Sequence, residues 1–129
     1  MKNIFFLTLL LTLCFSCKKK EEICNTSIIS TWQLVEMKVD PGIGSGTWQP
    51  VTSTKTITFS SGGHVSSNGK LCEMSSDTDG PTHGTYSDIE KYIVGDDCTS
   101  WKIQYELDGN TLVLRFPCIE ACAMRFRKI

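Results

Sequence analysis

The sequence is short of several residue types, and each shortage argues against a class of protein. It contains only 4 prolines and 2 histidines, and its 13 basic and 14 acidic residues give a net charge of −1. A charge this close to zero, without a basic stripe, offers little attraction for nucleic acid. Few prolines and 40% hydrophobic residues also argue against a disordered or fibrous chain. We expect a folded protein with no nucleic-acid partner.

The chain also has no apolar run of the length that spans a membrane as a helix. Its most apolar segment, Ile4 to Leu13, follows a short positive start at Lys2. A transmembrane helix needs about 20 apolar residues, whereas this length and charge are typical of a cleaved export signal. We therefore expect residues 1–16 to be a signal peptide. The remaining length suits one domain with a modest core, at residues 28–129.

The residues around Cys17 resemble the lipobox of Gram-negative lipoproteins, in which a small residue, here Ser16, precedes a cysteine that is lipidated before cleavage. The resemblance implies a palmitate-bearing lipid anchor in the outer membrane. Several acyl chains together are enough to hold a protein on a bilayer. Residues 17–27 would then be the lipidated cysteine and a charged, solvated tether. Residues 20–22 either resemble the export signal that sends some lipoproteins to the outer face of the outer membrane or are a plain spacer. The sequence therefore leaves open which leaflet carries the anchor. The alternative is an ordinary secreted protein with Cys17 in a disulfide.

The cysteine content indicates an oxidising compartment, since the chain has 7 cysteines. Cys14 leaves with the signal and Cys17 takes lipid, so an odd number remains; we expect Cys24 to be the unpaired thiol. The disulfide candidates are Cys72, Cys98, Cys118 and Cys122. The last two flank a sharp connection, and the first two bracket residues 73–97, but the sequence leaves the pairing open.

From Ile28 onward, apolar and polar residues alternate with the period of strands, between clusters of turn-forming residues. The Asp108-Gly109 pair between two alternating runs predicts a tight hairpin. Residues 40–50 and 73–82 are too polar for strands and are expected to be loops. The expected strands are Thr31 to Val39, Lys55 to Ser60, His64 to Ser67, Gly84 to Ile89, Lys91 to Val94, Trp101 to Leu107, Thr111 to Phe116 and Ala123 to Ile129.

The fold class follows from the absence of any sustained amphipathic helical pattern. Without helices to cover it, a sheet must close on itself or stack, and closure removes the exposed edges. We therefore expect an all-β fold, a small antiparallel up-and-down barrel of about eight strands.

Four short segments resemble the small lipocalin-like domains found as bacterial lipoproteins, and the resemblance covers roughly residues 28–129. These segments are residues 31–36, residues 55–60, residues 105–112 and residues 126–129. In that family a tryptophan on the first strand closes the barrel floor and a basic side chain near the end packs across it. The resemblance implies these roles for Trp32 and for Arg125 or Arg127.

Three other aromatic residues are candidates for a ligand pocket or for the barrel mouth. Trp48 lies in a glycine-rich segment, and Trp101 shares a strand face with Tyr105. An eight-stranded barrel either is filled by side chains or holds one small ligand. Packing in the core or against the wall is the alternative role for all three.

We expect no catalytic residues, metal or cofactor. Zinc at Cys118 and Cys122 would need His64 or His83, and a cysteine–histidine dyad would need one of the same histidines, but neither lies in a recognisable motif. The loop carboxylates that raise the question of glycoside cleavage are explained by turn chemistry. They are Asp77, Asp79, Asp96 and Asp97.

The sequence therefore predicts a non-enzymatic, lipid-anchored envelope protein whose barrel binds a small apolar ligand. The alternative is a filled barrel whose loops, near Trp48 or at residues 73–82, engage or inhibit a protein partner. The ligand, the partner, the oligomeric state and the biological process stay open at this stage.

Overall fold

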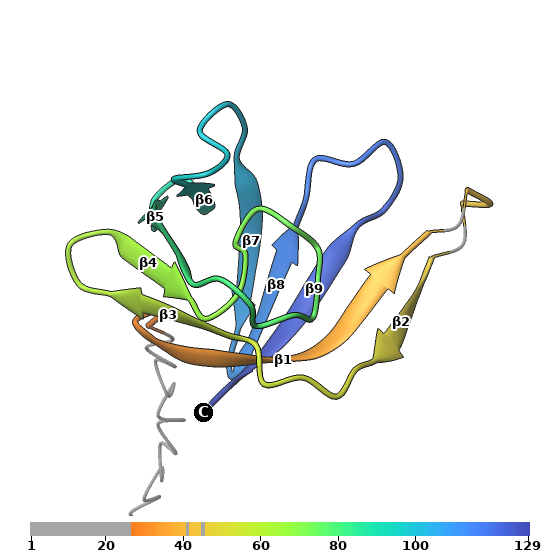
Figure 1. Ribbon diagram of the computed structural model, residues 1–129, viewed down its shortest axis with the longest axis horizontal. Coiled ribbons are helices and arrows are strands. Elements are labelled where there is room, and N and C mark those ends of the chain that lie inside the picture. Colours follow the sequence, from red (N-terminus) through yellow and green to blue (C-terminus); the bar gives the residue numbers. More distant parts are fainter. Residues whose placement is uncertain (1–26, 41, 45) are drawn as a thin grey trace, which may run out of the picture.

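The computed structural model describes residues 27–40, 42–44 and 46–129, which form an all-β fold (Figure 1). The predicted signal peptide, Cys17, Cys24 and nearly all of the tether lie outside the described residues. Within the described part of the chain the strands are β1 (Ser30–Val39), β2 (Thr47–Pro50), β3 (Thr56–Ser60), β4 (His64–Ser67), β5 (Thr82–Ser87), β6 (Tyr92–Gly95), β7 (Ile103–Asp108), β8 (Thr111–Arg115) and β9 (Ala123–Lys128).

Eight of these strands close into an up-and-down barrel, as the sequence predicts. From β3 to β9, each strand pairs antiparallel with the next strand in the chain, and β9 returns to pair along β1. One edge of β1 pairs with β9, and the first half of its other edge pairs with β3. Closure leaves these strands without a long exposed edge, which is how such barrels avoid edge-to-edge aggregation.

The ninth strand, β2, corrects the prediction that residues 40–50 form a loop. Thr47–Pro50 pairs antiparallel with the second half of β1, beside the part that β3 leaves free. β2 therefore stands outside the ring of eight strands and extends the sheet at one corner, seen at the right of Figure 1. Its polar sequence gives no alternation signal, because this strand packs no side chain into the barrel core.

The other strands lie within two residues of their predicted bounds. The hairpin between β7 and β8 is confirmed, with Gly109 at a φ of +55° in the turn. Glycine adopts this left-handed conformation at no steric cost. The loop predicted at residues 73–82 ends one residue early, because Thr82 pairs with Ser67 as the first residue of β5.

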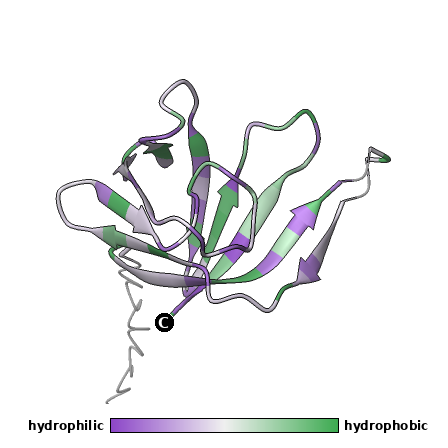
Figure 2. Cartoon of the chain, in the orientation of Figure 1, coloured by the Kyte–Doolittle hydropathy of each residue, from purple (hydrophilic) through white to green (hydrophobic). Residues whose placement is uncertain are grey.

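Inward-facing side chains fill the barrel, and the alternation of hydropathy along the strands is visible in Figure 2. The buried cluster consists of Ile28, Trp32, Leu34, Ile57, Phe59, Val65, Leu71, Ile93, Ile103, Tyr105, Leu112, Leu114, Met124 and Phe126. Residues 27–129 thus carry a hydrophobic core of their own, and we expect this segment to fold alone. No helix within the described ranges is long and apolar enough to cross a membrane.

The up-and-down topology gives the barrel two different ends. The short turns at residues 61–63, 88–91 and 109–110 lie at one end, which we call the floor, together with Ile28 and Ile129. The long connections at residues 40–46, 68–81, 96–102 and 116–122 lie at the other end, which we call the mouth. Connecting loops are where binding residues most often lie on a rigid scaffold, so the mouth is the first place to look for a site.

Candidate functional site: an apolar pocket at the barrel mouth

Two disulfides fix the long connections of the mouth, and both are pairs that the sequence offers. Cys72 and Cys98 join the β4–β5 connection to the β6–β7 connection, across a sequence separation of 26 residues. Cys118 and Cys122 close a short loop within the β8–β9 connection. Three of the four mouth connections are therefore covalently restrained, which reduces the conformational freedom of the loops that face the solvent.

Between these connections lies an apolar pocket of about 480 Å³, a volume within the range of small-molecule sites. Its lining residues come from all three disulfide-bearing connections: Cys72, Met74, Trp101, Phe116, Pro117 and Cys118. Several of these side chains are half-buried and pack on the barrel core below them. The pocket is thus a hollow in the loops above a filled barrel and lies outside the barrel interior.

Lys55 holds the connection that supplies two of the pocket residues. Its side chain is only 1% exposed, although it carries an ammonium group. The Nζ atom donates to the carbonyl oxygens of Lys70 at 2.8 Å and Ser75 at 2.7 Å, and lies 3.4 Å from that of Glu73. Because these three carbonyls belong to residues 70–75, Lys55 fixes the segment that contains Cys72 and Met74.

Burial lowers the pKa of Lys55 to about 8, while the carboxylates of Asp77 and Glu73 act in the opposite direction. Desolvation disfavours the ammonium form, whereas three carbonyl acceptors satisfy its three donors. Such a group is a structural clamp at neutral pH, when the ammonium is present. In Figure 1 the β4–β5 connection that it holds, drawn in green, crosses in front of the barrel strands.

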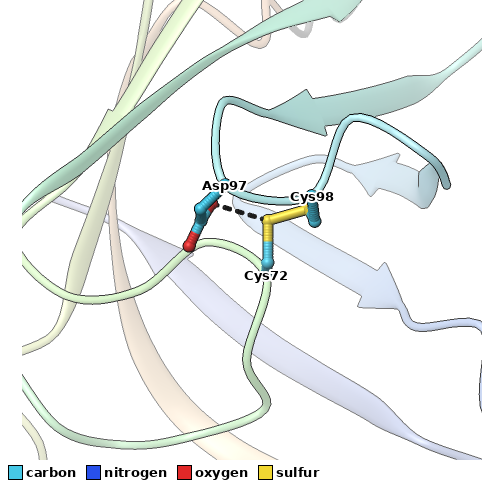
Figure 3. A group of neighbouring side chains, drawn as sticks. All are labelled: Cys72, Asp97 and Cys98. Carbon is cyan, nitrogen blue, oxygen red and sulfur yellow. Dashed lines mark hydrogen bonds between the residues drawn. A yellow bond between two sulfur atoms is a disulfide. The ribbon is translucent and has the colours of Figure 1, made fainter.

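A carboxylate outside the pocket lining lies beside the disulfide that contributes Cys72 to the pocket. Oδ1 of Asp97 lies 2.8 Å from Sγ of Cys72, and Figure 3 shows the Asp97 side chain directed at that sulfur atom. Asp97, Cys72 and Cys98 are also close enough together to hold a metal ion if the sulfurs were reduced. Their neighbour is Gly95, where a β-carbon would collide with Sγ of Cys72 and lie 3.1 Å from Sγ of Cys98.

The aromatic candidates for the mouth fall in three different places. Trp101 lines the pocket, just before β7 begins. Tyr105 is buried near the floor, where its hydroxyl lies 3.1 Å from the Ser87 carbonyl oxygen and 3.0 Å from Oδ1 of Asp88. Burial and this carboxylate raise the pKa of the Tyr105 phenol. Tyr105 is therefore a core residue, and the mouth receives only Trp101.

Trp48 lies on the outer wall of the barrel, away from the lining of the pocket. The guanidinium of Arg125 stacks 4.0 Å from its ring centroid and pairs with Glu36. A bulge in β1 between Leu34 and Glu36 turns Glu36 outward, opposite Arg125. Trp48 is half-buried in this arrangement, so its principal contact is with the barrel's own wall.

The cation beside Trp32 is Lys128, which takes the place predicted for Arg125 or Arg127. Trp32 is fully buried at the floor end of β1, and its indole N–H donates to the Ile28 carbonyl oxygen at 2.9 Å. Nζ of Lys128 lies 5.7 Å from the ring centroid. Because successive side chains of a strand alternate between faces, Arg125 and Arg127 share the outer face of β9.

The residues weighed for catalysis or metal binding do not converge. His64 and His83 are both exposed, on neighbouring strands, and Cys118 and Cys122 are bonded to each other. All four cysteines within the described ranges are in disulfides, so none of them supplies a thiolate for a dyad.

Of the loop carboxylates, Asp77 and Asp79 line a separate polar groove of about 650 Å³ beside Ser53. Asp77 also accepts a hydrogen bond of 2.7 Å from the Ser75 hydroxyl, as expected for turn chemistry. Asp96 and Asp97 border a shallow hollow beside His83.

Sequence reasoning missed Lys55, Met74 and Phe116 as parts of the site. A lysine at the start of a strand gives no sign that it is buried, and a single methionine in a polar loop gives no periodic signal. The Phe116-Pro117-Cys118 run was the one available clue, since it places apolar residues next to a disulfide-forming cysteine.

Comparison with known proteins adds no relative: neither a family model, nor a curated protein, nor a solved structure matches this chain.

Proposed function

We propose that this protein is a lipid-anchored envelope protein that binds a small, apolar molecule in the pocket at the barrel mouth. The observation that carries the proposal is the pocket itself, a hollow of about 480 Å³ whose lining is mostly apolar. Apolar pockets of this size with a few polar groups at the edge are the usual form of a small-molecule site. The anchor at Cys17 and the likeness to lipocalin-like lipoproteins are part of the proposal and rest on the sequence.

Two features of the mouth support binding there. The disulfides and the Lys55 clamp hold the pocket-forming connections before any ligand arrives, and preorganised loops lose less entropy on binding. In addition, Trp101 and Phe116 are only half-buried, so their aromatic surface is available for contact. We propose binding without catalysis.

The experiment is calorimetric titration of 1-decanol into residues 27–129, exported to an oxidising compartment and checked for a cooperative thermal transition. We expect saturable binding with one site, and a loss of affinity of about tenfold in Trp101→Leu, because this change removes aromatic contact area. Trp48→Leu is the matched control and should bind as the unchanged protein does. Absence of binding, or equal losses in the two variants, would refute the mouth pocket as the site.

A filled barrel that engages a protein through its loops is the second candidate. It is favoured by Ile43 and Ile119, which are 75% and 107% exposed on mouth connections that approach each other, since a β-carbon at Gly42 would lie 3.1 Å from Oε1 of Glu120. Large exposed apolar side chains are frequent at interaction sites. This candidate predicts that 1-decanol shows no saturable binding, with or without the changes Ile43→Ser and Ile119→Ser.

A further inference from the structure

Charged side chains are distributed unevenly between the two ends of the barrel. Among the described residues of the mouth connections, acidic side chains outnumber basic ones by more than two to one. The acidic side chains are Asp40, Glu73, Asp77, Asp79, Asp96, Asp97 and Glu120, and the basic ones are Lys70 and Lys102, while Lys55 reaches the same connections from the segment between β2 and β3. The whole chain carries a charge of only −1, so this excess is specific to the mouth.

The three lysines do not neutralise the pocket edge. Lys55 is buried against backbone carbonyls, and Lys70 pairs with Glu73 at 3.1 Å. Lys102 turns toward β6, where its Nζ lies 3.7 Å from the centroid of the Tyr92 ring. None of these hydrogen bonds, ion pairs or ring contacts involves Asp97, whose Oδ1 atom lies close to Sγ of the pocket-lining Cys72.

Asp97 lies next to the Cys72 edge of the pocket, although its side chain lines the neighbouring hollow beside His83. Its Oδ1 atom lies 2.8 Å from Sγ of Cys72, and Cys72 lines the pocket. The carboxylate is exposed, and no ion pair with it is found within the described part of the chain. A disulfide sulfur carries no proton to donate, so this contact does not neutralise the carboxylate. The Lys70 ammonium, which pairs with Glu73, also attracts the Asp97 carboxylate.

The pocket lining adds a second attraction for a cation. Trp101 and Phe116 supply aromatic surface, and Met74 and Cys72 supply polarisable sulfur. Aromatic faces attract ammonium groups, most strongly where water is partly excluded, and the apolar lining accommodates a hydrocarbon chain. An anionic amphiphile would instead meet the repulsion of the acidic rim.

We infer that the mouth pocket selects an amphiphilic cation: an organic ammonium group on an apolar chain, with Asp97 as its counter-charge. The inference rests on the proposed function, because it names the ligand class of the same pocket. The ligand is a small molecule whose ammonium group lies at the Cys72 edge and whose apolar chain lies against Trp101 and Phe116.

The test compares three probes that share a ten-carbon chain: decyltrimethylammonium, 1-decanol and decanoate, titrated below their aggregation concentrations into residues 27–129. At low salt we expect decyltrimethylammonium to bind about tenfold more tightly than decanoate, with 1-decanol between them. Raising the salt to 0.5 M should shrink this preference, because ions screen the attraction of an exposed carboxylate.

Asp97→Asn is the decisive variant and Asp96→Asn the matched control, since both remove one exposed carboxylate from the same loop. Asp97→Asn should weaken decyltrimethylammonium about fivefold and leave 1-decanol unchanged, whereas Asp96→Asn should have a clearly smaller effect. Binding of all three probes without charge preference, or equal effects of the two variants, would overturn the inference and leave the pocket intact. Failure of every probe to bind would overturn the proposed function as well.

Discussion

Lys55 illustrates how one residue positions a site that it does not touch. Its three carbonyl partners lie on the segment that contains Cys72 and Met74, so the pocket depends on an ammonium group beneath it. Removing a buried donor leaves its acceptors unsatisfied, which is the costly case for any hydrogen bond. The structural requirement for this lysine is therefore local, although its consequence extends to the mouth.

The buried ammonium predicts a specific dependence of stability on pH. The pKa of Lys55 is about 8 in the folded protein and has the ordinary value of 10.5 in the unfolded chain. Between these values the unfolded chain binds more protons, so stability rises with pH across this window as the desolvation penalty of the buried ammonium is relieved. We expect the free energy of unfolding to rise, relative to Lys55→Met, by up to about 3 kcal/mol.

Denaturant unfolding of both proteins at several pH values between 7.5 and about 10.5 measures this difference. The other titrating groups contribute equally to both proteins, so their effect cancels in the comparison. Residues 27–129 contain no cysteine outside the two disulfides, so disulfide exchange does not interfere in this range. A difference that stays flat, or falls, as pH rises would contradict the assignment.

The role of a residue was predictable where its burial follows from the alternation of apolar and polar residues along a strand. It was missed where burial depends on the course of a connecting loop. Trp32 lies at the floor, the place that the resemblance to lipocalin-like domains implied for a tryptophan on the first strand. The cation beside it was misplaced by a single residue, since Arg127 and Lys128 face opposite sides of β9. Lys55 was missed because its carbonyl partners come from a connection whose course no pattern in the sequence describes.

At the scale of elements, the two disulfides restrain very different lengths of chain. Chain-entropy arguments assign more stabilisation to the bond that closes the longer loop in the unfolded state. Cys72–Cys98 closes a loop with a separation of 26 residues, and Cys118–Cys122 one of only 4. The first also joins two separate connections, whereas the second lies within one.

We expect replacement of Cys72 and Cys98 together by alanine to cost about 3.5 kcal/mol, and the same change at Cys118 and Cys122 about 2 kcal/mol. Denaturant unfolding of the two double variants measures both values. The two pairs serve as controls for each other, since each variant removes one disulfide from the same end of the barrel. Equal costs, or the reverse order, would show that native-state packing rather than loop length sets the contribution.

Strand prediction succeeded where a strand faces the core and failed for β2, which does not. Eight strands carry an apolar side that the barrel buries, and this produces the alternation read in the sequence. β2 forms because β1 extends beyond the edge that β3 covers, which leaves backbone groups available for pairing. The cause of β2 therefore lies in the lengths and pairing of β1 and β3, and the residues of β2 themselves give no signal of it.

At the scale of the whole molecule, barrel closure was predictable because the sequence offers no helix to cover a sheet. The pocket was not predictable, because it forms where three connections meet that are distant in the chain. An interior ligand site was the expectation for the barrel. The buried cluster fills that interior and leaves the hollow above it.

The proposed anchor is tested at this same scale by metabolic labelling of the full-length chain with a palmitate analogue in a Gram-negative host. We expect label on the protein and recovery with the outer membrane, because a small residue precedes Cys17 in the lipobox-like segment. Cys17→Ala should lose both, whereas Cys24→Ala should keep both. Labelling that survives Cys17→Ala would place the lipid elsewhere and refute the assignment.

The position of the first residues that the structure describes has a consequence for the direction from which a ligand arrives. Ile28 contacts Trp32 at the floor, and the pocket lies at the opposite end of the barrel. From Cys17 to Ile28 a fully extended chain reaches about 40 Å. An anchored barrel would be tethered from its floor, the end opposite the pocket, so the pocket would be open to solutes in the aqueous space rather than held against the membrane that carries it.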